Sequence, residues 1–165
     1  MKHVKWIFVV LLLGSLTSFV GKDKSTGGLN VGDVAPDFTL RNQTADNAQA
    51  ELSQLKGRPV LISFWASYDG RSRLQNASLA AVLRNTPNNN VEMVSVSFDE
   101  YRSVFTETIR KDQIAAICLH EEAGNHSEIY RSYRLNRGFG NYLLDEKGVI
   151  IAKNITADEL AEYLN

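Results

Sequence analysis

Asp69 and Ser72 are a polar pair whose position suits chemistry, in the segment Trp65-Ala66-Ser67-Tyr68-Asp69-Gly70-Arg71-Ser72 that follows the apolar run Pro59 to Phe64. A Ser hydroxyl is a nucleophile only with a base beside it, and none of the three histidines lies near Ser72 in the sequence. An Asp that precedes a helix satisfies a free backbone N–H and the helix dipole, which contributes about 1 kcal/mol. We therefore predict that Asp69 caps a helix and that Ser72 is a polar residue within it. The alternative role for Asp69 is that of an acid or a ligand-binding group.

Cys118 is the only cysteine of the chain. It has no partner for an intrachain disulfide, and a lone thiol cannot cycle between dithiol and disulfide without a second thiol. We predict that Cys118 is a small buried hydrophobe on a short strand. The alternative is a single redox-active thiol, which needs exposure and a cationic neighbour. His120, two residues along the same strand, would share its face.

The segment His120 to His126 is similar to the zinc-binding helix of a metalloprotease, but that motif needs a second histidine at i+4, where this chain has Gly124. With one cysteine, the chain also cannot build a multi-cysteine metal site. We expect neither a metal nor a cofactor.

The composition favours one globular domain with a short additional segment. The chain has 165 residues, 44% of them hydrophobic, with a formal net charge of −1, so no basic surplus indicates nucleic-acid binding. Residues 1–21, with basic residues before an apolar run, are typical of a signal peptide or an N-terminal anchor. Lys22 stands where a lipidated cysteine would be, which leaves an uncleaved segment as the expected contact with a membrane. Residues 22–30 read as a linker and 31–165 as the domain.

The hydrophobic pattern alternates strands and helices and ends in a hairpin and a final helix. Arg58 to Trp65 is typical of a strand buried on both faces, and Thr156-Ala157-Asp158-Glu159 is a capping box. The other expected strands are 38–40, 91–98, 114–119, 142–145 and 149–152; the expected helices are 52–57, 101–111, 127–133 and one that begins after Asp69, with an apolar stripe of Leu74, Leu79, Ala80, Val82 and Leu83. This order predicts an α/β fold with a mixed central sheet flanked by helices on both faces.

Several segments in this order resemble the thioredoxin superfamily, and within it the exported TlpA/ResA-like branch that is related to the AhpC/TSA proteins. Val31 to Leu40 resembles that branch's "G-x-x-A-P-x-F-x-L" opening, and Trp65 to Tyr68 matches the turn before its redox pair. Further matching segments are Leu52 to Leu61, Val94 to Asp99 and Tyr142 to Ile150. The resemblance implies a thioredoxin-like fold and a thiol–disulfide oxidoreductase ancestry.

Three departures from the family pattern concern its redox site. Asp69 and Ser72 occupy the positions of the two family cysteines, and Phe139 occupies that of the family's cis-proline. A cis bond before Phe139 would cost about 3 kcal/mol, so we predict a trans bond. Ser63 stands where many relatives bury a proton-shuttling carboxylate. These departures indicate that the chain has lost dithiol exchange.

The resemblance then suggests a binding module, with the surface that relatives use to hold substrates now holding an extended peptide or a partner protein of the cell envelope. We predict that this surface comprises Tyr68, Asp69, Gly70, Arg71, Gly138, Phe139 and Gly140. Tyr68 and Phe139 are expected to be exposed and to supply apolar contact, whereas Arg71 is either simply solvated or a contact for an anionic partner. The alternative function is a one-thiol oxidoreductase or peroxidase that uses Cys118. The expected location is the periplasm or cell envelope of a bacterium.

Overall fold

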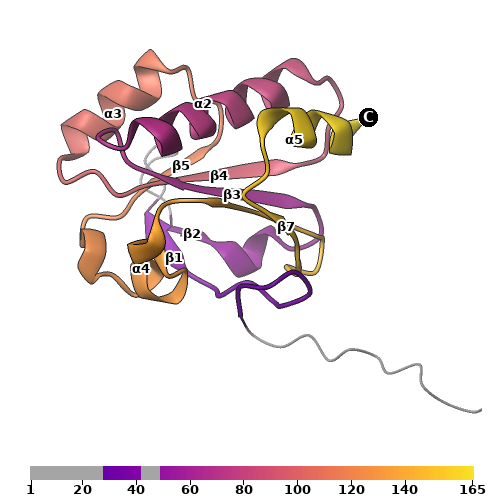
Figure 1. Ribbon diagram of the computed structural model, residues 1–165, viewed down its shortest axis with the longest axis horizontal. Coiled ribbons are helices and arrows are strands. Elements are labelled where there is room, and N and C mark those ends of the chain that lie inside the picture. Colours follow the sequence, from indigo (N-terminus) through magenta and orange to yellow (C-terminus); the bar gives the residue numbers. More distant parts are fainter. Residues whose placement is uncertain (1–27, 42–48) are drawn as a thin grey trace, which may run out of the picture.

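A mixed five-stranded sheet forms the centre of the computed structural model, which describes residues 28–41 and 49–165 (Figure 1). The strand order is β5–β4–β3–β6–β7. The three strands β3, β4 and β5 are parallel, β6 is antiparallel to β3, and β7 is antiparallel to β6. Their bounds are β3 Val60–Trp65, β4 Glu92–Ser97, β5 Ile117–His120, β6 Asn141–Leu144 and β7 Ile150–Lys153. The predicted mixed sheet and its closing hairpin are confirmed.

Helices cover both faces of this sheet, as predicted. The helices α2, α3 and α5 lie on one face, and α4 lies on the other with the small β1–β2 sheet (Figure 1). The bounds of the helices are α2 Gly70–Asn85, α3 Arg102–Lys111, α4 Glu128–Ser132 and α5 Ala157–Leu164. Short 3-10 turns and the small sheet complete the second layer: η1 Leu52–Leu55, η2 Gly124–His126, η3 Leu135–Arg137, β1 Thr39–Arg41 and β2 Gln49–Glu51.

The strand β3 has an apolar core on each side. All six of its residues are buried, with Ile62 and Phe64 in the core under α4 and with Leu61 and Trp65 in the core under α2 and α5. Successive side chains of a strand point to opposite faces, so a strand covered on both sides needs a continuous apolar run. This is the pattern that the sequence indicated for the segment that ends at Trp65.

The helix α2 begins at Gly70 behind the cap residue Asp69 and buries Leu79, Ala80 and Leu83 against the sheet. Leu74, which we placed in the apolar stripe, is instead 69% exposed. Its position lies about half a turn from the buried stripe, and the polar residues Ser72 and Asn76 occupy the buried positions on either side of it. The predicted stripe was wrong at this one residue because the helix buries hydrogen-bonded polar groups near its start.

Other element boundaries differ by a few residues from those expected. The strand β5 begins at Ile117 rather than at residue 114, and the helix expected over 127–133 is the single turn α4. The strand β2 was not predicted; it begins at Gln49 and pairs with β1. The capping box of α5 is confirmed, since Thr156 Oγ1 accepts from the Glu159 amide at 3.2 Å while the Glu159 carboxylate accepts from the Thr156 amide at 2.7 Å.

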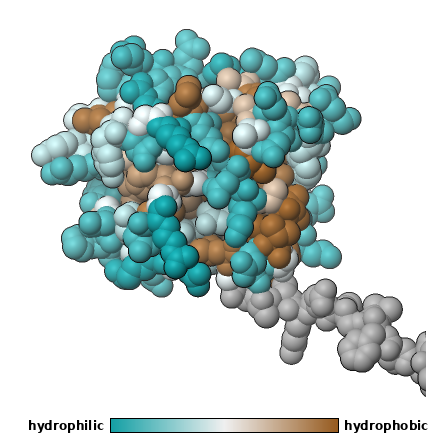
Figure 2. Space-filling model, in the orientation of Figure 1, coloured by the Kyte–Doolittle hydropathy of each residue, from teal (hydrophilic) through white to brown (hydrophobic). Residues whose placement is uncertain are grey.

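The described part of the chain already contacts the domain at its first residues. The amide of Gly28 donates to the carbonyl of Val34 at 3.3 Å, and Leu29 packs against the core. The predicted signal or anchor segment 1–21 lies outside the described residues, as does most of the linker 22–30. No helix within residues 28–41 and 49–165 is long and apolar enough to span a membrane. Hydrophilic residues predominate on the face drawn in Figure 2, with hydrophobic residues in separate patches.

Candidate functional site

The turn that joins β3 to α2 is closed by hydrogen bonds rather than by cysteines. The Asp69 carboxylate accepts from the Ser72 amide at 2.9 Å, which confirms the predicted helix cap. The Ser72 hydroxyl is buried, donates to the carbonyl of Asp69 at 3.2 Å and accepts from the amide of Ala66 at 3.4 Å. Ser72 is therefore engaged by the backbone of the turn, and no described base contacts its hydroxyl.

The carboxylate of Asp99 lies beneath the same turn and was not identified from the sequence. It is 2% exposed and follows β4. One carboxylate oxygen accepts from the Ser67 amide at 2.8 Å and from the Ser67 hydroxyl at 2.5 Å, and the other accepts from the Ser97 hydroxyl at 2.8 Å. The sequence held a signal for this contact, because Asp99 and Ser67 each lie at the end of a predicted strand, and the ends of two neighbouring parallel strands meet at one edge of a sheet. Ser63, which the resemblance placed at the position of a buried carboxylate, is buried within β3.

The loop Gly138-Phe139-Gly140 faces the start of α2. Gly138 has a φ of 117°, which favours glycine, and a side chain at Gly140 would collide with that of Asn154. The carbonyl of Gly140 accepts from the Phe64 amide at 3.0 Å, so the loop is tied to β3. The described residues contain no cis peptide bond, and the bond before Phe139 is trans as predicted.

The two aromatic side chains of the predicted surface have different environments. Tyr68 is 74% exposed, as expected, and the pKa of its hydroxyl is raised by partial burial and by the nearby Tyr130, Asp99 and Asp69. Phe139 is only half-exposed, so the prediction of an exposed ring was wrong. It stacks on Phe98 with ring centroids 5.6 Å apart, and Tyr68 lies 6.5 Å from it. Phe139 is partly buried because its ring packs on that of Phe98, which follows the end of β4.

A groove with a volume of about 600 Å³ runs between the start of α2 and the loop Gly138 to Gly140. Five of the predicted surface residues line it: Asp69, Arg71, Gly138, Phe139 and Gly140. Tyr68 and Gly70 are not part of its lining, although Tyr68 contacts Phe139. The structure adds three cations that the sequence did not connect with the site: Arg134, Arg137 and Lys153. Residues of both segments therefore line one groove, and the role of this surface in binding stays a prediction.

Tyr142 forms part of the same groove. Its side chain is half-buried, and burial raises the pKa of its hydroxyl while the positive charge of Arg134 acts in the opposite direction. Tyr133, beneath it, donates its hydroxyl proton to the carbonyl of Pro36 at 2.6 Å, and burial raises its pKa strongly. One wall of the groove is therefore aromatic, and a guanidinium stands beside it.

Cys118 lies on β5 with none of its surface exposed. Burial raises the pKa of its thiol to about 12, and its sulfur lies 3.4 Å from the carbonyl of Ala116. His120 shares the face of Cys118, as the strand periodicity predicts, and stacks on Phe105 with ring centroids 5.2 Å apart. The Nε2 of His120 donates to the carbonyl of Asp99 at 2.7 Å. A protonated, buried thiol lacks the exposure that the one-thiol alternative requires.

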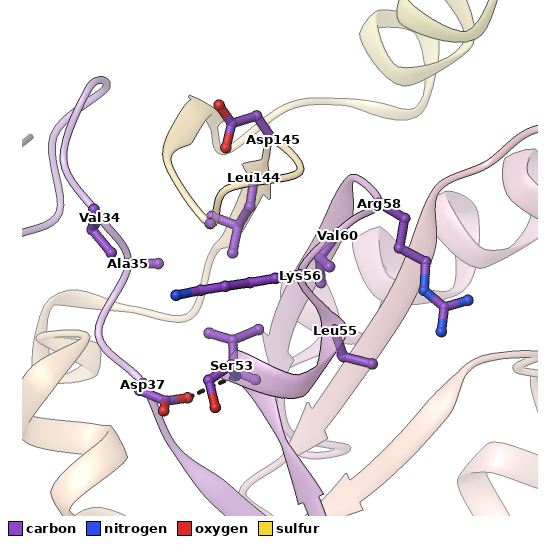
Figure 3. A pocket seen from close by; sticks show the side chains of 12 residues that line it. Val34, Ala35, Asp37, Ser53, Leu55, Lys56, Arg58, Val60, Leu144 and Asp145 are labelled. Atoms are coloured by element: carbon purple, nitrogen blue, oxygen red, sulfur yellow. Dashed lines mark hydrogen bonds between the residues drawn. The ribbon is translucent and has the colours of Figure 1, made fainter.

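A second, smaller cavity of about 80 Å³ lies at the opposite end of β3, between the N-terminal segment and the β6–β7 hairpin (Figure 3). Apolar side chains such as Val34, Ala35, Val60 and Leu144 line it, and Lys56 extends across it (Figure 3). Its volume suits a few water molecules rather than a peptide. Within residues 28–41 and 49–165, no cluster of three His, Cys, Asp or Glu side chains could hold a metal ion.

Residues 31–153 match the profile of the AhpC/TSA family. The chain belongs to the AhpC/TSA family. Its relatives include the thiol-disulfide oxidoreductase ResA of Oceanobacillus iheyensis, which is 25% identical over 96% of this chain and 84% of its own length. The thioredoxin-like protein YneN of Bacillus subtilis is 27% identical over 88% of this chain and 86% of its own.

Solved structures confirm the thioredoxin-like fold. The crystal structure of a thioredoxin-like protein from Parabacteroides distasonis is 38% identical, with a TM-score of 0.71 over 86% of this chain and 98% of that one. The chain is thus similar to thiol–disulfide oxidoreductases of the thioredoxin fold. Against that background, the residues that we expect at the two cysteine positions, Asp69 and Ser72, are a helix cap and a buried serine.

Proposed function

We propose that this protein is a member of the thiol–disulfide oxidoreductase family that no longer exchanges disulfides and instead binds an extended peptide or partner protein in the cell envelope. Two observations together carry the proposal. The groove is intact, and the turn between β3 and α2 is held closed by hydrogen bonds. The Asp69 carboxylate accepts a hydrogen bond from the Ser72 amide, and the Ser72 hydroxyl donates to the Asp69 carbonyl. The groove that meets them remains open, with a volume of about 600 Å³.

The state of Cys118 supports the loss of exchange. Disulfide exchange requires a thiolate that can reach its target, and the thiol of Cys118 is buried and has a pKa of about 12. Nothing in the described residues favours the alternative in which Cys118 acts alone. The export part of the proposal rests on the N-terminal sequence, whose basic residues precede an apolar run within residues 1–21.

The first test is the reduction of insulin by dithiothreitol in the presence of the purified protein, compared with its Cys118→Ser variant. We expect neither protein to exceed the rate of dithiothreitol alone, because no described thiol is accessible. Activity of the parent protein that is lost in the variant would mean that Cys118 performs one-thiol chemistry, and the proposal would be wrong.

The second test concerns binding at the groove. A mixed set of fluorescently labelled extended peptides is titrated with the protein, with Tyr68→Ala and with Leu74→Ala. Both substitutions remove a large exposed apolar side chain from the same region of the chain, but only Tyr68 contacts Phe139 at the groove. We expect Tyr68→Ala to weaken binding by about fivefold or more and Leu74→Ala to leave it unchanged. Equal affinities of all three proteins would refute a binding role for this surface.

A further inference from the structure

The arginines of the described chain differ in whether they have a partner. Several of them are engaged elsewhere on the surface, as in the ion pairs Arg58–Glu92 at 2.7 Å, Arg73–Asp112 at 2.7 Å and Arg110–Glu107 at 2.5 Å. By contrast, the guanidinium groups of Arg71, Arg134 and Arg137 make no hydrogen bond or ion pair with another described residue. All three line the groove beside the start of α2.

The groove therefore has an excess of positive charge in a chain whose formal net charge is −1. Four cations line it, the fourth being Lys153, whose ammonium group donates to the carbonyl of Leu29 at 3.0 Å. Asp69 is the one carboxylate among its described lining residues, and it is already used to accept from the Ser72 amide. Within the described chain the cations of this groove thus lack carboxylate partners, and the charge is available to a ligand.

Arg134 is held in an unusual backbone conformation at this place. Its φ of 51° and ψ of 41° are left-handed values, which residues with a Cβ atom seldom adopt. The turn at Arg134 joins α4 to η3 and brings the guanidinium near Tyr142, where its charge opposes the rise in the pKa of that hydroxyl. A cation beside an aromatic wall can pair with a carboxylate while the ring contacts an apolar neighbour of that carboxylate.

We propose that this groove binds an extended acidic peptide segment, whose carboxylates pair with Arg71, Arg134 and Arg137 while intervening apolar side chains contact Phe139 and Tyr142. The inference rests on the proposed function and names the chemistry of its partner. A peptide fits better than a single small anion because the three arginines come from separate segments along a groove of about 600 Å³: Arg71 from α2, and Arg134 and Arg137 from the turn before η3 and from η3 itself. Guanidinium groups bind carboxylates with two parallel hydrogen bonds, which adds specificity to the attraction of charge.

The test uses two labelled peptides of equal length, one that alternates Glu with apolar residues and one in which Gln replaces every Glu. Fluorescence anisotropy measures their affinity for the purified protein at low and at high salt. We expect the acidic peptide to bind about tenfold more tightly at low salt, and the difference to shrink as salt screens the charges. Equal affinity of the two peptides would overturn the inference.

Single substitutions then locate the effect. Arg134→Asn removes the charge and keeps a residue that tolerates a left-handed backbone, and Arg137→Gln removes the neighbouring charge. We expect each to weaken binding of the acidic peptide by about threefold to tenfold and to leave binding of the Gln peptide unchanged. The matched control is Arg84→Gln, because Arg84 lies in the last turn of α2, far along that helix from its capped start. An equal loss in the control would mean that net charge, and not the groove, is responsible, and the inference would be wrong.

The outcomes separate this inference from the function on which it rests. If both peptides bind with equal affinity and Tyr68→Ala weakens both, the binding module stands and its acidic preference is wrong. If neither peptide binds, both proposals fail. Inorganic phosphate serves as a competitor. If phosphate displaces the acidic peptide when the two supply similar concentrations of negative charge, the groove is a site for small anions and the peptide assignment is overturned.

Discussion

The two ends of β3 differ in the volume of the cavity beside them and in whether the arginines there have a carboxylate partner. At its first residue lies a cavity of about 80 Å³ that Lys56 crosses, and the arginine at that end, Arg58, is paired with Glu92 (Figure 3). Beyond its last residue lies a groove of about 600 Å³ whose arginines have no carboxylate partner in the described chain. One strand therefore connects an end with a small, mainly apolar cavity (the closed end) to an end with a large groove lined by cations (the open end).

The groove at the open end keeps its shape without a disulfide. The open end is held by buried polar bonds: Asp99 to Ser67, Ser72 to the backbone of the turn, and Gly140 to Phe64. The closed end is held mainly by apolar contacts such as those of Val60 and Leu144. Substitutions at the two ends should thus separate stability from binding.

The largest effect is expected at the closed end. Leu144 is 1% exposed in the core, so Leu144→Ala should lower the free energy of unfolding by about 3 kcal/mol through lost burial and a new cavity. Peptide binding by the folded protein should not change. Urea denaturation and fluorescence anisotropy measure the two quantities, with the exposed Leu74→Ala as control. Loss of binding in the folded variant would show that the two ends are coupled.

A somewhat smaller effect is expected beneath the groove. Asp99→Ala removes a buried carboxylate and leaves the Ser67 amide and the Ser97 hydroxyl without their acceptor, so unfolding should become easier by about 2 kcal/mol. In contrast to Leu144→Ala, this variant should also bind peptides less tightly, because the turn before α2 is released. Glu100→Ala, which removes the exposed acid next in sequence, should change neither quantity. Unaltered binding by Asp99→Ala would argue against its role in holding the turn.

The buried thiol predicts a pH dependence of the core that the open end does not share. Folding raises the pKa of Cys118 from 9.0 to about 12, so its contribution to stability is complete below pH 9 and is lost as the pH rises toward 12. In this range the unfolded chain loses the proton first, which lowers the free energy of unfolding by about 1 kcal/mol at pH 10. Cys118→Ala should show a shallower decline between pH 9 and 10 in urea denaturation. Parallel curves for the two proteins would contradict a buried, protonated thiol.

The smallest effect is expected for the exposed ion pair of the closed end. Arg58→Gln should change the free energy of unfolding by about 0.5 kcal/mol or less, since Arg58 is half-exposed and its pair with Glu92 is screened by solvent. Its binding of acidic peptides should equal that of the parent protein. Arg137→Gln should change the free energy of unfolding equally little, and yet it should weaken the binding of acidic peptides. Equal binding by both variants would remove the distinction between the two ends.

Much of the fold could be predicted because local signals and periodicity specified it. The apolar run of β3, the Asp69 cap and the Thr156–Glu159 capping box each depend on residues that are neighbours in the sequence. Leu74 and β2 were predicted wrongly for the opposite reason. The buried side of α2 near its start is chosen by Asn76, which accepts from the Ser95 hydroxyl of β4, and by Ser72, which is bonded to the preceding turn. The strand β2 exists through pairing with β1.

The candidate site was predicted only in part. The resemblance of local segments placed the start of α2 opposite the loop Gly138 to Gly140, and the groove confirms that these two segments meet. It did not indicate that Phe139 turns inward onto Phe98, because that stacking depends on where β4 ends. The ends of two predicted strands offered a signal for Asp99 beside Ser67, which lies 32 positions earlier, but only the pairing of β3 with β4 brings the two together.

Residue types along the chain predict the strand, turn and helix that display Asp69 and Ser72, and they exclude a cysteine pair, because residue identity and short-range hydrogen bonding decide both. Tertiary contacts alone bring four cations into one groove without carboxylate partners among the described residues: Arg71, Arg134, Arg137 and Lys153. These cations belong to segments separated by up to 82 positions. Their charges add to one positive electrostatic field only when β3, β6 and β7 pair and bring those segments to the same end of the sheet.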